Sequence, residues 1–174
     1  MKKLILFTAA ICMLVSQIVM ADTINIMVDD NKGLKNDGAI GGLSLSYVWD
    51  RNEHWESFFG FDLAGDLALE SIQSINSITF YVNETHTYYT GNNVHIYNAD
   101  DDAWADGIYT YGGYGSSLGY HFFPSGRTIS GGDPVNRWYA YDVTSLAGSL
   151  TDNGKLGLYL ALPTKDDWHN YAFH

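Results

Sequence analysis

The sequence predicts an all-β protein, an antiparallel β-sandwich of about eight short strands with one short helix. Three observations support this fold class. Apolar and polar residues alternate in short blocks, polar turn signals separate the blocks, and the chain is rich in glycine and aromatic residues while only 17% of its residues are charged. Period-two alternation is typical of strands with one buried face, and a succession of such blocks is typical of sandwiches.

The expected strands follow one another along the whole chain. They are residues 23–29, 43–49, 58–63, 77–83, 93–99, 138–144, 154–162 and 168–174. In the clearest blocks every second residue is apolar, so that face of the strand is expected to enter the core. These inward residues are Phe59, Phe61 and Leu63, then Ile78, Phe80 and Val82, and finally Leu156, Leu158, Leu160 and Leu162.

Turn-forming residues stand between these blocks, because glycine, proline, asparagine and aspartate favour tight turns. The expected turns are residues 29–33, 41–42, 91–93, 131–134 and 152–154. Ser145 to Leu150 is expected to be the one short helix. Thr144 is its predicted N-cap, because a threonine oxygen can accept a hydrogen bond from a free backbone N–H there.

The first 21 residues have the pattern of a secretory signal peptide. Lys2 and Lys3 precede an apolar run that is too short for a permanent membrane span and ends at Ala21. We therefore expect one domain over residues 22–174, secreted or at the cell surface and without membrane insertion. Cys12 is the only cysteine and lies in the signal peptide, so the expected mature chain has no disulfide. Ile11 is too bulky for a lipidation signal before Cys12.

The charge balance narrows the classes of partner. The chain has 20 acidic and 9 basic residues, and two of the basic residues lie in the signal peptide. An acidic surface repels phosphate backbones and anionic lipid headgroups. Nucleic acid and anionic membranes are therefore excluded as expected partners.

Several blocks together resemble a known family. FFGFDL, SINSITFYVNE, NVHIYNADDDAW, WYAYDVTSL and GKLGLYLAL occur in the order of the DNRLRE-type, or disaggregatase-related, domain, which overlaps a carbohydrate-binding-module family. Phe61, Asp62 and Leu63 match one family motif, and Asp142, Val143 and Thr144 match another. The resemblance covers nearly the whole mature chain. It implies a jelly-roll-like sandwich attached to a polysaccharide-active enzyme or a cell-surface protein.

The chain departs from the family pattern in two respects. The family closes with a further strand, whereas this chain stops at His174. One interpretation is that the domain is truncated at its C-terminal strand, with a lost C-terminal domain or anchor beyond it. In addition, members that bind polyanions resemble basic-lined binders, and this chain is acidic. The expected polysaccharide partner is therefore neutral rather than strongly anionic.

The glycine- and tyrosine-rich segment 109–123 is the candidate ligand site. Aromatic rings can cover the apolar faces of sugars, while amides, carboxylates and arginine bond their hydroxyl groups. The alternative, which we favour on sequence alone, is a long crossover loop whose tyrosines cover one end of the sandwich. The candidate ligand-binding residues are Trp104, Tyr109, Tyr111, Tyr114, Tyr120, His121 and Arg127.

Clusters of aspartate suggest a structural calcium ion, because Ca²⁺ prefers oxygen ligands and such ions stabilise loops of extracellular sandwiches. The weak candidates are Asp29, Asp30, Asp100, Asp101 and Asp102. None has the spacing of a calcium loop, so the alternative is that they are solvated strand ends. No other cofactor is expected. Asp62 and Asp142 are instead expected to accept backbone or hydroxyl donors at strand ends.

No catalytic site is expected. The six histidines show no metal-binding spacing, and residues 114–119 lack the frame of a serine-nucleophile elbow. The best enzymatic candidates are Glu53 and Glu56 beside Trp55, but the sequence gives them no carboxylate partner across a cleft.

The sequence therefore predicts a non-catalytic, secreted carbohydrate-binding or cell-surface module. The alternative is a structural or adhesive extracellular protein without glycan specificity. A small polysaccharide lyase or hydrolase is the third class.

Overall fold

The computed structural model describes residues 25–26, 28, 30–38, 40–41, 46–50, 54–63, 74–89, 91–100, 102–124, 126–127, 136–148, 154–162 and 169–173. The predicted signal peptide lies outside these residues. So do the expected turn at 131–134 and most of the expected turn at 152–154. Within the described part of the chain, no helix has the length and apolar character needed to cross a membrane.

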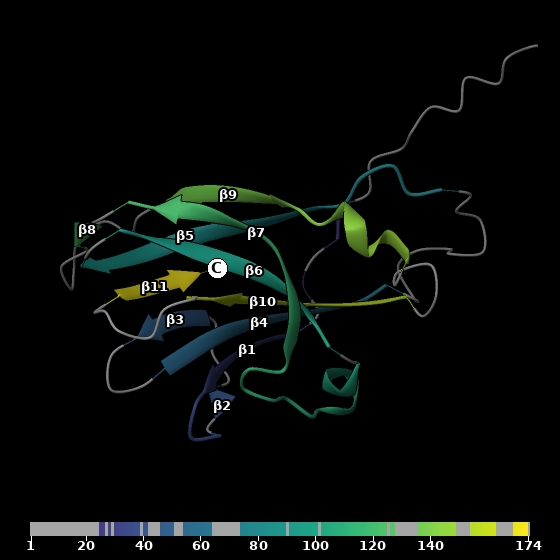
Figure 1. The fold of residues 1–174 in the computed structure, drawn as a ribbon, viewed down its shortest axis with the longest axis horizontal. Helices are drawn as coiled ribbons and strands as arrows, with labels where there is room; N and C mark the ends of the chain where they lie inside the picture. The colour runs from purple at the N-terminus through teal and green to yellow at the C-terminus, as the bar shows by residue number, and fades with distance from the viewer. Residues whose placement is uncertain are drawn as a thin grey trace, which may run out of the picture.

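The fold is an antiparallel β-sandwich, as the sequence predicts (Figure 1). Its strands are β1 (Asp30–Lys35), β2 (Ile40–Gly41), β3 (Ser46–Asp50), β4 (His54–Asp62), β5 (Thr79–Tyr89), β6 (Asn92–Ala99), β7 (Tyr114–Phe123), β8 (Gly126–Arg127), β9 (Arg137–Asp142), β10 (Lys155–Ala161) and β11 (His169–Phe173). Two short 3₁₀ helices are present in the described residues, η2 (Ala103–Asp106) and η3 (Thr144–Leu146).

The strands form two layers that share one core. The first layer has the order β7-β6-β10-β4, with β1 also paired to β4, and the second contains β11, β5 and β9. β3 pairs with both β4 and β11 and so joins the layers on one side. On the other side the two edge strands, β7 and β9, lie next to each other. In Figure 1 β4 and β10 lie below, and β5 and β9 lie above.

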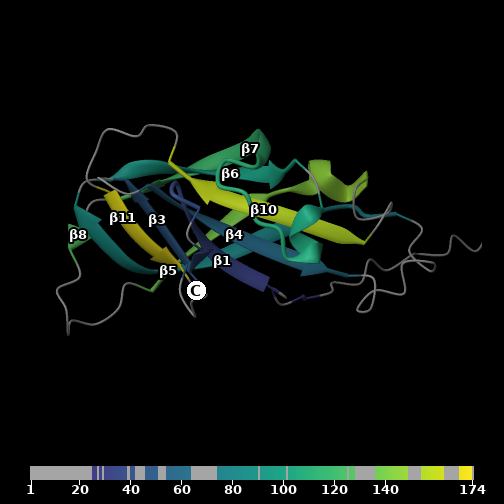
Figure 2. The same ribbon diagram turned by 90° about the horizontal axis from the view of Figure 1, so that it is seen from below.

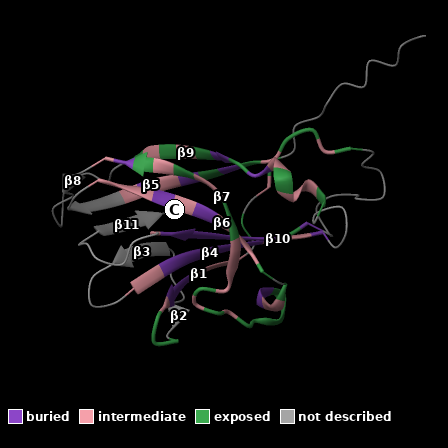
Figure 3. Ribbon diagram, in the orientation of Figure 1, coloured by how far each residue is buried: buried purple, intermediate pink, exposed green. Residues whose placement is uncertain are grey.

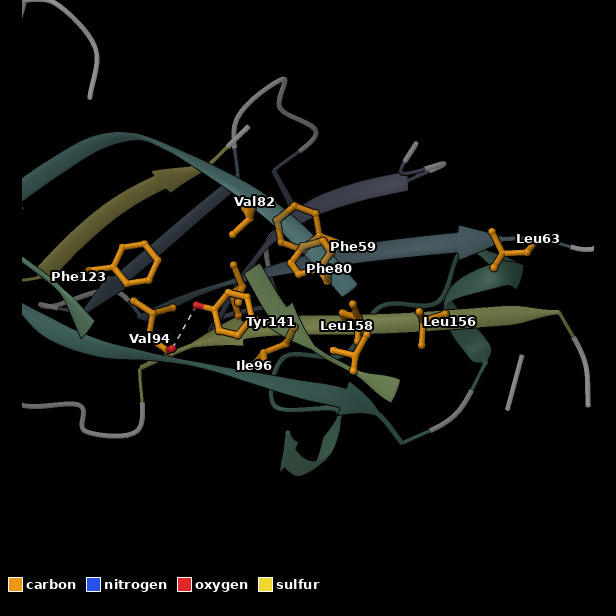
Figure 4. Close-up of a cluster of buried hydrophobic side chains, with 12 residues drawn as sticks. Phe59, Leu63, Phe80, Val82, Val94, Ile96, Phe123, Tyr141, Leu156 and Leu158 are labelled. Atoms are coloured by element: carbon orange, nitrogen blue, oxygen red, sulfur yellow. Dashed lines mark hydrogen bonds between the residues drawn. The ribbon is translucent and has the colours of Figure 1, made fainter. Parts of the chain in front are cut away.

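The main core lies between the layers (Figure 4). Phe59 of β4 contacts Phe80 of β5 at 5.2 Å between ring centroids. The Tyr141 hydroxyl of β9 donates to the Val94 carbonyl of β6 at 3.3 Å. The predicted inward residues of 58–63, 77–83 and 154–162 contribute to this core, either buried in it or packed against it. Period two therefore identified these faces correctly.

Three segments differ from the sequence-based expectation. Residues 29–33 were expected to form a turn, but β1 begins at Asp30 and pairs with β4 along its whole length. Residues 25, 26 and 28, expected in a strand, have no regular structure. The prediction of a crossover loop in the glycine-rich segment was also wrong for residues 114–123, which form strand β7 against β6. Pairing with a neighbouring strand outweighs the low strand propensity of glycine, asparagine and aspartate.

The expected helix begins differently from the prediction, is helical through Gly148, and has its last two predicted residues outside the described part of the chain. Val143, not Thr144, is the N-cap of η3, and Thr144 is its first residue. The Thr144 hydroxyl accepts the backbone N–H of Ile78 at 3.0 Å instead. Asp142 accepts the backbone N–H of Thr144 at 2.9 Å, which confirms its predicted role at a strand end. A hydrogen bond with the Thr144 side chain, followed by this bond from its backbone N–H, lowers the pKa of the Asp142 carboxyl.

Candidate functional site

The first layer has an outer face, on the side away from the main core, that carries a second group of aromatic rings. Phe58 of β4 stands opposite Tyr159 of β10, which stands opposite Tyr97 of β6. His95 of β6 stands opposite Tyr120 of β7. Neighbouring rings are in contact, with Tyr97 4.4 Å from Tyr114 and Tyr114 5.6 Å from Tyr159 between centroids.

Residues 102–113, here called the cap, cover part of this outer face. The cap contains η2 and the loop that follows it, and it lies against β4 and β10 (Figure 2). Its central side chain is Trp104, which is only 6% exposed. The Trp104 ring is 5.6 Å from the ring of Phe58.

Two glycines make room for the Trp104 indole. Gly60 and Gly157 are direct partners on β4 and β10. A Cβ atom at Gly60 would lie 2.6 Å from the indole ring, and one at Gly157 would lie 3.0 Å from its Nε1. Cβ atoms in proteins essentially never lie closer than 3.0 Å to such a neighbour, so a side chain at Gly60 would force something to shift. The indole therefore lies directly on the sheet backbone, where side chains would otherwise exclude it.

Polar contacts hold the rest of the cap to the sheet. The Tyr109 hydroxyl donates to Asp30 of β1, and Lys32 pairs with the same carboxylate. The Lys32 ammonium also lies 5.4 Å from the centre of the Tyr109 ring. The Tyr159 hydroxyl donates to the Thr110 carbonyl at 3.4 Å.

Glu56 of β4 is the buried carboxylate under the cap. It accepts the backbone N–H of Gly112 at 2.8 Å. Burial, followed by the charge of Glu56, raises the pKa values of Tyr97 and Tyr114. Both phenols therefore remain neutral donors at physiological pH. Glu56, the expected enzymatic candidate, is occupied in holding the cap, and Glu53 lies outside the described residues.

The outer face is open beyond the cap. Tyr120 and Phe122 are two residues apart on β7 and are 59% and 61% exposed. Residues with this spacing on a strand point to the same side, about 7 Å apart. Tyr120 is stacked on His95, with 5.0 Å between centroids and 26° between planes. Burial lowers the pKa of His95, so its ring is uncharged at neutral pH.

His121 points the other way, toward β9. Its Nε2 is 2.7 Å from the Ala140 carbonyl, so this nitrogen carries a proton and donates it to the hydrogen bond. The ring meets Tyr141 edge-on at 4.6 Å. His121 therefore connects the two edge strands, and its Nε2 is already engaged there. Arg127 lies in β8, and its side chain lies outside the described residues.

A second exposed pair, Tyr81 and Trp138, lies on the outer side of the β5–β9 layer. These two residues are 63% and 64% exposed. Figure 3 shows exposed positions along β9. Tyr81 stands opposite Ala140, two residues along β9 from Trp138. Neither this pair nor Phe122 was among the predicted site residues. The period-two alternation of apolar residues could have found Tyr81 and Trp138. Their neighbours along β5 and β9 face inward, and these are Phe80, Val82, Tyr139 and Tyr141.

Of the predicted site residues, the structure brings Trp104, Tyr109, Tyr111 and Tyr114 together as the packed covered part of the outer face. Only Tyr120 belongs to the open part. Of the calcium candidates, Asp30 is engaged by Lys32 and Tyr109, and Asp29 and Asp101 lie outside the described residues. No group of three metal-ligating side chains gathers in the described ranges.

Comparison with known proteins adds no relative. No protein-family model matches the chain, and no curated protein matches it either. The resemblance to the DNRLRE-type domain therefore stays a prediction from the sequence blocks.

Proposed function

We propose that the protein is a non-catalytic, secreted or cell-surface module that binds a neutral polysaccharide through the open part of its outer face. The observation that carries this proposal is the Tyr120 ring, 59% exposed and held against His95 by stacking. A ring fixed on a rigid strand loses little side-chain entropy when a ligand covers it.

The surroundings of Tyr120 support the choice of ligand. Phe122 presents a second ring on the same strand, and Asn93 stands opposite Phe122 on β6. The Ser117 hydroxyl lies beside His95 at 3.3 Å. Apolar rings flanked by amide and hydroxyl groups are suited to pyranose rings. The acidic chain disfavours anionic polysaccharides.

The test is retention of the mature chain by insoluble neutral polysaccharides, compared with the Tyr120→Ala and Tyr81→Ala variants. Both tyrosines are highly exposed, so neither change should unfold the protein. We expect Tyr120→Ala to lose about fivefold or more in affinity, since one aromatic ring stacked on a nucleic-acid base contributes about 1–3 kcal/mol and a ring covering a sugar face acts in the same way. Tyr81→Ala should bind like the wild type. Equal binding by all three proteins would reject the proposal.

The Tyr81–Trp138 pair supports a second candidate, self-association through the β5–β9 layer in a structural or adhesive role. Exposed large rings on a sheet face are suited to protein contacts. Sedimentation of wild type and Trp138→Ala over a range of concentrations tests this candidate. Concentration-dependent assembly that the variant lacks, without polysaccharide retention, would favour it over saccharide binding.

A further inference from the structure

The exposed Tyr120 ring belongs to a stack of three rings with His95 at its centre. His95 of β6 stands directly opposite Tyr120 of β7, and their rings are 5.0 Å apart with 26° between their planes. His95 is also stacked on Tyr97, two residues further along β6, at 5.9 Å and 21°. His95 therefore links the exposed ring to Tyr97.

The inner end of this stack is held by the packed part of the outer face. Tyr97 lies 4.4 Å from Tyr114, and Tyr114 lies 5.6 Å from Tyr159, between ring centroids. The Ser117 hydroxyl lies 3.3 Å from Nδ1 of His95. The His95 ring is thus supported by neighbours on both β6 and β7.

The outer end of the stack depends on His95 alone. Among the described residues, His95 is the ring that contacts Tyr120. Gly119 precedes Tyr120 and offers no side chain, and His121 follows it but points toward β9. Without the stack, the Tyr120 side chain would be free to change rotamer. Binding would then have to immobilise it, which lowers the affinity for a ligand that covers this ring.

The surroundings of His95 favour its neutral form. Contact with the phenol rings removes water from the imidazole, and this burial lowers the pKa of His95. None of its described neighbours on the outer face is charged at neutral pH. These neighbours are Tyr97 and Asn93 on β6, Tyr120 and Ser117 on β7, and Ala161 on β10. The Ser117 hydroxyl can donate or accept, so it does not select either form of the imidazole.

We propose that His95 is a positioning residue of the saccharide site: its uncharged ring holds Tyr120 in place for the ligand, and protonation of His95 weakens binding. A protonated imidazole is stabilised by water, so it leaves the stack and frees the Tyr120 ring. This inference rests on the proposed saccharide binding and adds its regulation by pH.

Thermodynamic linkage gives the direction of the pH dependence. The bound state needs the neutral, stacked imidazole, so saccharide binding opposes protonation of His95. The affinity is therefore constant above the pKa of His95 in the free protein and falls as the pH drops through that value. Because the pKa of His95 lies below the ordinary value of 6.5, the fall begins below pH 6.5.

The experiment measures retention of the protein by cellulose, mannan and starch, three insoluble neutral probes. On each probe that retains the wild type, we expect the affinity to fall about threefold or more between about pH 7.5 and about pH 5, since uptake of one proton weakens binding by at most about tenfold per pH unit. Circular dichroism at each pH verifies that the protein remains folded.

Two substitutions separate the stack from the proton. His95→Phe keeps a planar ring but has no group to protonate, so it should bind like the wild type near neutral pH and lose the pH dependence. His95→Ala removes the stack and should bind about three- to tenfold more weakly near neutral pH, because a further side chain must be immobilised. It should also lack the pH dependence. A residue that only stabilised the fold would give neither the flat profile nor the rescue by phenylalanine.

The outcomes separate this inference from the proposed function. Retention that depends on Tyr120, with a pH profile equally steep in His95→Phe and wild type, overturns the role of His95 and leaves saccharide binding standing. Equal affinity of His95→Ala and wild type near neutral pH does the same. So does a wild-type affinity that is flat or rises on acidification, and a rise would mean that attraction between the imidazolium and the phenol rings outweighs burial. Retention by none of the three probes rejects both proposals.

Discussion

The outer face of the first layer has two parts that share aromatic side chains but differ in exposure. Under the cap, Trp104 and its neighbours are packed against Phe58 and Tyr159. Beyond the cap, Tyr120 and Phe122 stand in solvent. The difference does not come from residue type, because tyrosines occur in both parts. The difference in exposure arises because the sheet under the cap carries residues that bind the cap.

Two kinds of residue make the covered part possible. Gly60 and Gly157 provide a flat surface for the indole, and Glu56 and Asp30 provide acceptors for the cap. The open part has a supporting ring in His95, and Tyr120 and Phe122 remain exposed there, with no cover from the described residues. Aromatic content alone therefore does not mark a binding surface. The rings left without a cover are the candidates for ligand contact.

The largest expected effect is the contrast between two tryptophans. Trp104→Ala should reduce the free energy of unfolding by about 3–5 kcal/mol, because a large buried ring is lost. Trp138→Ala should change it by less than about 0.5 kcal/mol, because that side chain is 64% exposed. Urea unfolding measures both. Similar losses in the two variants would show that the cap is not packed as described.

Removing the Glu56 carboxylate should have the next largest effect. Glu56→Ala leaves the Gly112 N–H without its buried acceptor, which we expect to destabilise the protein by about 2–3 kcal/mol. Glu56→Gln keeps an acceptor oxygen and should cost less. Urea unfolding and limited proteolysis within residues 102–113 provide the measurement. A cap equally resistant to proteolysis in Glu56→Ala and wild type would contradict this role.

The glycine slot gives a smaller but more specific effect. Gly60→Ala should destabilise by about 1–3 kcal/mol, because its methyl group collides with the Trp104 ring. In a Trp104→Ala background the same change should cost little, so a double-mutant cycle isolates the contact. Gly148→Ala is the control, because a methyl group there meets nothing within 4 Å. Additive effects of the two changes would contradict the slot.

The smallest expected effect concerns the Tyr109 phenol. Burial, and then its hydrogen bond to Asp30, raises the pKa of Tyr109 to about 12. Because the folded pKa lies above the ordinary value of 10, the stabilisation is complete below pH 10 and is lost as the pH rises toward 12. Phenolate absorbance should show a tyrosine that titrates near pH 12 and that Tyr109→Phe lacks. Titration of that phenol near the ordinary value of 10 would contradict the bond to Asp30.

Much of the fold follows from the sequence, because one-sided strands reveal themselves by alternation. The inward faces of β4, β5 and β10 are examples. β7 was missed because its glycines have low strand propensity and a bulge at Gly119 interrupts its register. β1 was missed because its polar residues are typical of turns, although pairing with β4 determines its structure.

The candidate site was less predictable than the fold. Tyr159 and Tyr97 alternate with core residues, so the pattern places them on an outer face but does not indicate what covers that face. Trp104 meets Gly60 and Gly157 only after the cap folds back over two strands distant in sequence. Sequence alone could therefore collect the rings near residues 104–120 but could not separate the buried ones from Tyr120.

Tyrosine nitration mapped by peptide mass spectrometry, with and without a neutral polysaccharide, tests the central claim most directly. Without ligand, Tyr120 and Tyr81 should react fastest and Tyr114 much more slowly, in keeping with their exposure and with the burial that raises the Tyr114 pKa. With ligand, Tyr120 should become protected while Tyr81 reacts as before. Fast reaction of Tyr114 in the free protein, or protection of Tyr81 in place of Tyr120, would contradict the account.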